Sequence, residues 1–488
     1  MRSLLARTKS GDVLGRAESG LQYFLGIPFA EQPCGPLRFK RAVPVKPWEG
    51  VFQADHYGDP APQDNHREFT GTENCLTLNV VRPEDGEDLP VIVWIHGGGY
   101  NIGSASDPMY RGDAFAKNGI VFVSIQYRLN VLGFYDFTGM PGCEGIESNR
   151  GLSDMITAIQ WIHENIAAFG GDPGRVTIAG ESAGGAAVLT LMAVPAVRGC
   201  FSQVIAESGL ANCVTTHELQ HEYMGLFLEG MGWTEEDLPK LWTMDPLELV
   251  HGHNYLEYCL QYRFPGALEP CPVIDDLLPE RPLDAIAKGS AENIRLLIGT
   301  NLHEGTMFVR PEGTTFPSNW EMVREMFRRG GHADRLEDVR AYYDDPAKAA
   351  FGSPFVHLAT DYAFQEPSVQ AALLQSRHGS ARVYRFEYIS EAGRQSGLLA
   401  AHAFELPVVF ALEDGPFFEG DNREEVHALV SAMHSAWCSF IRGEDPEDWP
   451  EFTSPESPVR IFDAPVRTQA LAYGEMLQVW DGLTFYRS

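Results

Sequence analysis

The decapeptide VTIAGESAGG, residues 176–185, joins a short apolar run to the start of an apolar helical pattern. Residues 176–179 have the continuous hydrophobicity of a strand that is covered on both faces of a sheet. Residues 180–184 follow with the spacing Gly-x-Ser-x-Gly, and residues 186–192 have a helical pattern. Small residues on both sides of the serine permit a turn in which a Cβ would collide with neighbouring backbone. The stretch therefore predicts a strand, a sharp turn that exposes Ser182, and a helix.

Similar elements surround this stretch. Apolar residues recur at helical spacing over residues 152–166, and Gly170-Gly171 is a typical signal for the end of a helix. Short runs rich in Val and Ile, of strand length, occur at residues 91–95, 121–125, 203–206 and 295–298. Strand, helix, strand is the pattern of an α/β domain. We expect a buried, mainly parallel sheet flanked by helices, in a single domain of residues 1–488, because no linker or shift in composition divides the chain.

One segment has a different pattern. Residues 211–269 contain amphipathic helical patterns and no strand runs. We expect a helical excursion over the active site, within residues 211–290. Its aromatic residues have two readings, either as apolar walls of a substrate cavity or as core: Tyr255, Tyr258, Tyr262 and Phe264.

Composition excludes several classes of partner. The 67 acidic residues outnumber the 37 Lys and Arg, which gives a formal net charge of −30. Binding to a phosphate backbone or to an anionic membrane needs a basic face, and no stretch concentrates cations. We therefore expect no nucleic-acid partner and no membrane partner, and a monomer or homodimer that acts on a small molecule.

Targeting signals and cysteine spacing point to a compartment. The N-terminal cations are not followed by the apolar core of a signal peptide, and no apolar stretch reaches the roughly 20 residues that span a bilayer. The eight Cys include no CxxC pair, so we expect reduced, buried thiols in place of disulfides or a zinc cluster. The predicted location is cytoplasmic.

A run of three glycines supplies a second feature of a serine hydrolase. The segment WIHGGGY, residues 94–100, follows a predicted strand. When a serine adds to an ester carbonyl, negative charge develops on oxygen and needs N–H donors at about 2.7–3.1 Å. Consecutive glycines let the backbone approach that closely, whereas a phosphate-binding loop would need GxxxxGK[ST] or GxGxxG spacing, which is absent here. Tyr100, which closes the run, should border the substrate cavity.

Longer motifs extend the pattern along nearly the whole chain. In order they are FLGIPFAEQPCGPLRFKRA, ENCLTLNV, YRLNVLGF, NRGLSDMITAIQWIHENIAAFGGDPGRVTIAGESAGG, PVIDDLLPERP, GTNLHEGTMF and HAFELPVVF. In this order the chain resembles the type B carboxylesterase family, and its pattern is most similar to the bacterial para-nitrobenzyl esterases of that family. The resemblance implies the α/β-hydrolase fold, with helical insertions above the active site.

The same resemblance implies the catalytic residues. It matches Ser182 to the nucleophile, Glu304 to the acid and His402 to the base, and the oxyanion-hole donors to Gly98, Gly99 and Ala183. Residue type alone leaves rivals open: Asp275 and Asp276 for the acid, and His303, His427 and His434 for the base. The implied activity is hydrolysis of neutral carboxylic esters through an acyl-enzyme on Ser182, with no cofactor and no metal.

Two departures from the family pattern affect what we expect. Animal members pair the cysteine of the motif matched by ENCLTLNV with an earlier one, but Cys34 lies at a different place, so Cys75 should be a free thiol. Residues 56–74 contain no Trp, whereas cholinesterases place an aromatic residue there to hold a quaternary ammonium. Choline esters are therefore not the expected preferred substrates.

Two other functions compete with this interpretation. His217-Glu218-Leu219-Gln220-His221 is an HExxH string, in which two His on one helix face could bind Zn²⁺ while Glu218 activates water. The sequence does not match the longer form of this motif that metzincins have, since Met224 occupies the position that needs Gly. The alternatives are thus a zinc metallopeptidase at this helix, or a non-catalytic binding protein on a hydrolase scaffold.

Overall fold

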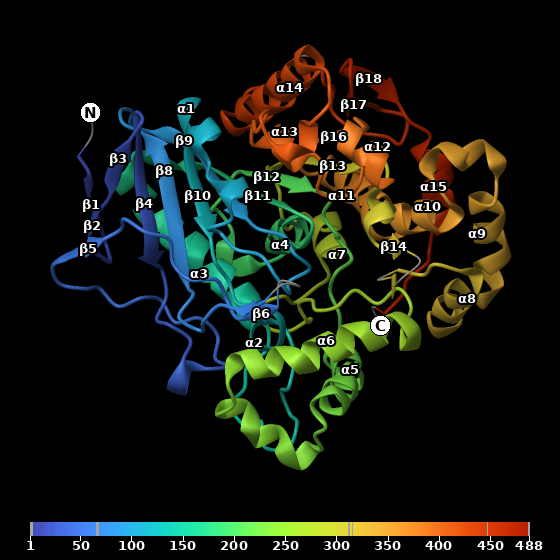
Figure 1. Cartoon of the computed structure of the whole chain (residues 1–488), viewed down its shortest axis with the longest axis horizontal. Coiled ribbons are helices and arrows are strands. Elements are labelled where there is room, and N and C mark those ends of the chain that lie inside the picture. The colour runs from blue at the N-terminus through green and yellow to red at the C-terminus, as the bar shows by residue number, and fades with distance from the viewer. Residues whose placement is uncertain (1–2, 65–67, 311–312, 315, 447, 487–488) are drawn as a thin grey trace.

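The structure, a computed structural model, describes residues 3–64, 68–310, 313–314, 316–446 and 448–486. An 11-stranded sheet in the order β18-β17-β16-β13-β12-β11-β9-β10-β8-β4-β3 forms its centre (Figure 1). The strands of this sheet are β3 Arg16–Glu18, β4 Leu21–Pro28, β8 Thr77–Pro83, β9 Leu89–Ile95, β10 Val121–Ile125, β11 Gly171–Glu181, β12 Gln203–Glu207, β13 Arg295–Asn301, β16 Ser380–Phe386, β17 Pro458–Phe462 and β18 Arg467–Ala470. All pairs from β10 through β9 and β11 to β17 are parallel.

Short strands lie outside the central sheet. They are β1 Leu5–Thr8, β2 Gly11–Leu14, β5 Val51–Gln53, β6 Gln63–Asp64, β7 Phe69–Thr70, β14 Val309–Arg310 and β15 Gly313–Thr314. The helices are α1 Asp113–Lys117, α2 Asn130–Gly133, α3 Arg150–Asn165, α4 Ala183–Leu191, α5 His217–Met231, α6 Pro246–Arg263, α7 Pro282–Ala287, α8 Trp320–Arg329, α9 Leu336–Tyr343, α10 Pro354–Thr360, α11 Glu366–Gln375, α12 Glu391–Ser396, α13 Leu406–Val409, α14 Arg423–Ile441 and α15 Tyr473–Trp480.

Alternate residues of the central strands face two separate cores. On β9, Val91, Val93 and Ile95 join the core that contains α3, α4 and α11, while Ile92 and Trp94 join the core that contains α1 and α14. All five are at most 1% exposed. Because successive side chains of a strand point to opposite faces, a strand covered on both faces is apolar at most of its positions. The continuous apolar runs in the sequence are explained by this burial on both faces.

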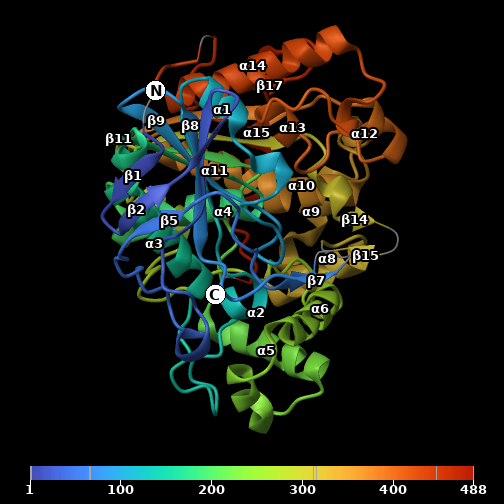
Figure 2. The ribbon, with the colours of Figure 1, turned by 60° about the vertical axis from the view of Figure 1, so that its left-hand side comes forward.

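Helices α5 and α6 lie apart from these two layers. Figure 1 shows them below the sheet, and Figure 2, turned by 60°, still places α5 at the opposite end of the molecule from α14. They pack mainly on each other, around a third core that includes Tyr223, Phe227 and Leu256. Helix α7 instead contacts α11 and α4. Among the described residues, no helix combines the length and the apolar composition needed to cross a bilayer.

The structure confirms the expected parallel strands and corrects other expectations. The five predicted strand runs lie in β9, β10, β11, β12 and β13, and α3 ends before Gly170, which adopts the left-handed conformation at φ 82°. Sequence patterns did not predict β3, β4, β8, β16, β17 or β18, which extend the sheet on both sides of the predicted strands. All eight cysteines are free, Cys75 included, as expected. Cys34 is exposed, however, and so departs from the expectation of buried thiols.

Candidate active site

Ser182 lies at the turn between β11 and α4, where the chain reverses sharply. Its backbone is strained, with φ 59° and ψ −122°, a region that residues with a Cβ rarely adopt. Its N–H donates to the carbonyl of Glu207 at 2.9 Å, which ties the turn to the end of β12. Gly184 has to be glycine, because a Cβ there would lie 2.0 Å from the Ile95 carbonyl oxygen. The hydroxyl of Ser182 therefore sits at the carboxyl edge of the sheet, at the N-terminus of α4.

The glycine run after β9 forms a second turn beside Ser182. Gly98 has φ 102°, and a Cβ there would lie 2.2 Å from the Ile102 carbonyl oxygen, so no other residue fits. The Gly98 carbonyl accepts bonds from Asn101 and Ile102. No described residue accepts a hydrogen bond from the N–H of Gly98 or Gly99. These two groups, together with Ala183 at the first position of α4, line the same cavity as Ser182 and can donate to an oxygen there.

His402 is held from one side by Glu304. Its Nδ1 lies 2.6 Å from Glu304 Oε2, and Glu304 has no exposed surface. The other carboxylate oxygen of Glu304 accepts bonds from the N–H of Asn301 and the hydroxyl of Ser208, both at 2.6 Å. The rings of Phe308 and Phe364 pack on the imidazole. This arrangement fixes the ring, with Nδ1 as the donor and Nε2 as the nitrogen that is free to take a proton.

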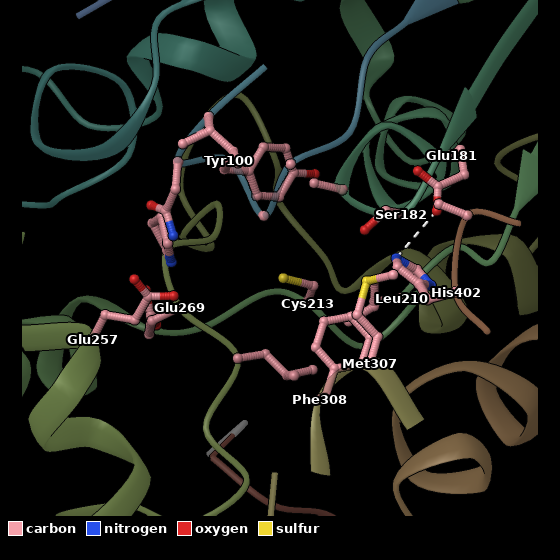
Figure 3. A pocket seen from close by; sticks show the side chains of 18 of the residues that line it. Tyr100, Glu181, Ser182, Leu210, Cys213, Glu257, Glu269, Met307, Phe308 and His402 are labelled. Carbon is pink, nitrogen blue, oxygen red and sulfur yellow. Dashed lines mark ion pairs between the residues drawn. The ribbon is translucent and has the colours of Figure 1, made fainter. Parts of the chain in front are cut away.

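The Nε2 atom of His402 faces a second carboxylate. Glu181 Oε1 lies 3.1 Å from it, and Figure 3 marks this ion pair. Nε2 has no hydrogen-bond partner among the described residues, so none joins it to Ser182. Burial alone would lower the pKa of His402, but the charges of Glu181 and Glu304 outweigh it and raise the pKa to about 9. Burial raises the pKa of Glu181 to about 7.

Sequence reasoning missed several buried polar residues around this pair. Glu207 accepts a bond from Trp437 Nε1 at 2.7 Å, and burial raises its pKa well above the usual range. Glu405 accepts a bond from the Asn301 amide, and burial raises its pKa to about 8. Ser208 donates to Glu304 and also lies 3.5 Å from Glu405 Oε1. The triad candidates are thus embedded in a group of buried carboxyl groups in which protonation of one changes the others.

A cavity of about 620 Å³ opens onto Ser182 (Figure 3). Tyr100 lines it, as the sequence predicted. Its apolar lining includes Leu210, Cys213, Leu268, Met307, Phe308 and Phe316. Of the two interpretations of the aromatic residues in the helical excursion, the core one holds for Phe264, which is buried in the third core, and none of the four residues lines the cavity. Tyr258 and Tyr262 have neither role, since they are 61% and 57% exposed. Helix α6 instead contributes polar residues to the cavity, namely His253, Asn254 and Glu257.

The HExxH string occupies the first turns of α5. His217 Nδ1 contacts Asp136, and His221 Nε2 lies 3.8 Å from the same carboxylate. Glu218 is exposed, on the solvent side of the helix. Within the described part of the chain, no three His, Cys, Asp or Glu side chains are placed so that they could hold a metal ion. Nothing in this geometry favours the zinc peptidase alternative.

The whole chain is similar to known esterases. A family model described as "Carboxylesterase family" matches residues 2–480. Para-nitrobenzyl esterase of Bacillus subtilis (strain 168) is 34% identical, with 96% of each chain covered. Liver carboxylesterase of Sus scrofa is 31% identical over 98% of this chain and 92% of its own. A solved structure of a PNB esterase superposes with a TM-score of 0.86 at 32% identity, covering 98% of this chain and all of that one.

Proposed function

The chain belongs to the carboxylesterase family, and we propose that Ser182, Glu304 and His402 are the catalytic triad of this α/β-hydrolase. The protein is a serine carboxylesterase. What we propose in addition is the identity of the catalytic residues and the role of each. The observation that carries the assignment is the buried contact of 2.6 Å between His402 Nδ1 and Glu304, beside a strained serine in the same cavity as His402.

The proposed reaction has two halves. His402 Nε2 takes the proton of Ser182 as its oxygen attacks the ester carbonyl, and then delivers that proton to the leaving alcohol. Glu304 keeps the proton on Nδ1 and stabilises the charged imidazole. The N–H groups of Gly98, Gly99 and Ala183 donate hydrogen bonds to the oxyanion as it develops. Water, activated by His402, then hydrolyses the acyl-enzyme and releases the carboxylate.

Two broader expectations remain proposals. We propose a cytoplasmic location, which the eight free thiols support, because reduced cysteines are typical of that compartment. We also propose that the protein acts as a monomer or homodimer without a nucleic-acid partner, in line with its net charge of −30.

Covalent inhibition tests the nucleophile directly. A 4-nitrophenyl alkylphosphonate should release one equivalent of 4-nitrophenol per chain, abolish ester hydrolysis, and leave its phosphonyl group on the peptide that contains Ser182. Treatment with EDTA should leave the rate unchanged. Adduct mapping by mass spectrometry decides the result. Loss of activity with EDTA, or an adduct on a different serine, would contradict the proposal and reopen the zinc alternative at His217.

The pH profile tests the influence of Glu181 on the base. The rate constant kcat/KM for a neutral ester should rise with pH as His402 loses its proton, with an inflection near the raised pKa of about 9. The negative charge of Glu181 raises that pKa, so Glu181→Gln should lower it and move the inflection down by about one pH unit. Stopped-flow assays from pH 5.5 to 10 measure the shift. Glu164→Gln, which removes an exposed glutamate on α3, should leave the inflection in place. An unmoved or raised inflection in Glu181→Gln would refute this role.

A further inference from the structure

The part of the substrate cavity remote from Ser182 is acidic. Figure 3 shows Glu257 and Glu269 on one side of the cavity and Ser182 and His402 on the other. Asp64 belongs to the same lining. Among the described residues that line the cavity, the only Arg or Lys is Arg310, and that residue is exposed. A ligand that spans this cavity therefore meets carboxylates at the end opposite the reacting bond.

Glu269 lies at the cavity wall with only neutral hydrogen-bond donors around its carboxylate. Its Oε2 accepts a bond from the Gln220 amide at 2.6 Å, and its Oε1 lies 3.3 Å from the thiol of Cys271. Both donors are neutral, and no described cation forms an ion pair with Glu269. Burial raises its pKa to about 8, since the ionised form lacks a counter-charge. A half-buried carboxyl group in this state gains from a ligand that brings a positive charge.

The neighbouring carboxylates are held in place by α6. Asn254 Nδ2 donates to Asp64 at 2.9 Å, and His253 Nε2 lies 3.6 Å from Glu257. His253 is itself fixed by a hydrogen bond with the hydroxyl of Tyr135. The helix therefore keeps the acidic side chains at the cavity wall, where rigid elements position a charge better than loops do.

An independent observation indicates that a polar ligand enters this cavity. Tyr100 is 1% exposed and lines the cavity, and its hydroxyl has no hydrogen-bond partner among the described residues. In Figure 3 its ring lies between Ser182 and the two glutamates. An unpaired buried hydroxyl destabilises the protein because it has lost its hydrogen bonds to water, and a bound ligand can restore such a bond. The cavity thus presents a nucleophile, a hydrogen-bonding group and a carboxylate in succession.

We propose that Glu269, with Glu257 and Asp64 beside it, forms a cation subsite in the substrate cavity, and that the preferred substrates are esters bearing a protonated amine. The inference rests on the proposed role of Ser182, because the ester has to reach that residue while its amine reaches Glu269. Carboxylates bind an ammonium group through N–H hydrogen bonds as well as charge. A protonated primary, secondary or tertiary amine is therefore favoured over a quaternary ammonium, which has no N–H to donate.

Matched esters separate the charge from the shape of the substrate. We would compare 3-(dimethylamino)propyl butanoate with 4-methylpentyl butanoate, its uncharged isostere, and with the trimethylammonium analogue. A second pair, ethyl 5-(dimethylamino)pentanoate and ethyl 6-methylheptanoate, places the amine on the acyl side. With pH-stat assays at pH 8, the wild type should show a kcat/KM at least tenfold higher for the amine than for the isostere in one of the two pairs. The quaternary analogue should fall between amine and isostere.

Variants of the acidic residues test whether the cation subsite causes the preference for the amine ester. Glu269→Gln should reduce the ratio of amine to isostere about tenfold, and Glu257→Gln, the substitute if the first variant does not fold, should reduce it in the same direction. Glu248→Gln removes an exposed charge from α6 outside the cavity and should leave the ratio unchanged. An unchanged ratio in folded Glu269→Gln, or a wild type that does not prefer the amine in either pair, would overturn the cation subsite. Failure to hydrolyse even the neutral isosteres would instead count against the proposed function.

Discussion

Replacement of Ser182 by Ala should lower kcat/KM for a neutral ester by about 10⁵–10⁶-fold, the largest effect that we expect of any single change. No acyl-enzyme can form without the hydroxyl, and removing the nucleophile of a serine hydrolase costs about as much as removing the whole triad. The fold should tolerate the change, because Ser182 caps α4 with its backbone and no side-chain cap bond is lost. Steady-state rates at high enzyme concentration, together with a thermal melt, measure both effects.

A matched serine makes this result specific. Ser202 lies just before β12, and its N–H donates to the Val176 carbonyl, but it does not line the cavity. Ser202→Ala should keep its rate within about twofold of the wild type. The residual rate of Ser182→Ala should also be insensitive to the phosphonate. More than about 1% of wild-type activity in Ser182→Ala, still blocked by the phosphonate, would mean that another residue is the nucleophile.

The central strands of the sheet could be predicted because the burial of each strand is visible in its own residues. A parallel strand buried on both faces is apolar at most positions, so β9, β10 and the middle of β12 stand out in the sequence, although Ser124, Gln203 and Glu207 are buried polar residues on β10 and β12. The edge strands escape this rule. Strand β18 is mostly exposed and three of its four residues are polar, so its formation depends on pairing with β17 rather than on its own pattern. Tertiary context decides such strands, and single-sequence patterns do not contain it.

The residues of the site also differ in how far the local sequence could predict them. Ser182 lies in a motif whose strand and helix are both visible, whereas the choice of His402 among 15 His rested on the family motif. Glu181, Ser208 and Asn301 were missed as neighbours, although each ends or directly follows a predicted parallel strand. The carboxyl ends of parallel strands meet at one edge of the sheet. The position of these three residues at or just after the ends of such strands could therefore have indicated that they lie near Ser182. The spacing of the aromatic residues on α6 could not decide between cavity wall and core, and the structure shows that Tyr258 and Tyr262 point to solvent whereas Tyr255 packs on the third core.

Substitution of Glu304 by Gln should lower kcat/KM by about 10⁴-fold, the second largest effect. Three donors point at this carboxylate, from His402, Asn301 and Ser208. An amide has one accepting oxygen, so its NH₂ group must face either Asn301, whose N–H cannot accept, or His402. In the second orientation His402 Nδ1 has to accept a hydrogen bond from the NH₂ group of the glutamine. The ring proton then lies on Nε2, so that His402 can no longer take a proton from Ser182. A comparable change of tautomer in another serine hydrolase has an effect of this size.

Glu405 supplies the matched control for Glu304. Both are fully buried glutamates, and both contact Asn301 and Ser208, but the carboxylate of Glu405 makes no direct contact with His402 among the described residues. Glu405→Gln removes one carboxyl group from the same cluster while leaving the tautomer of the base unchanged. Its loss of kcat/KM should therefore be at least two orders of magnitude smaller than that of Glu304→Gln. Equal losses in two folded variants would mean that the charge of the cluster, and not the hydrogen bond to Nδ1, is what catalysis requires.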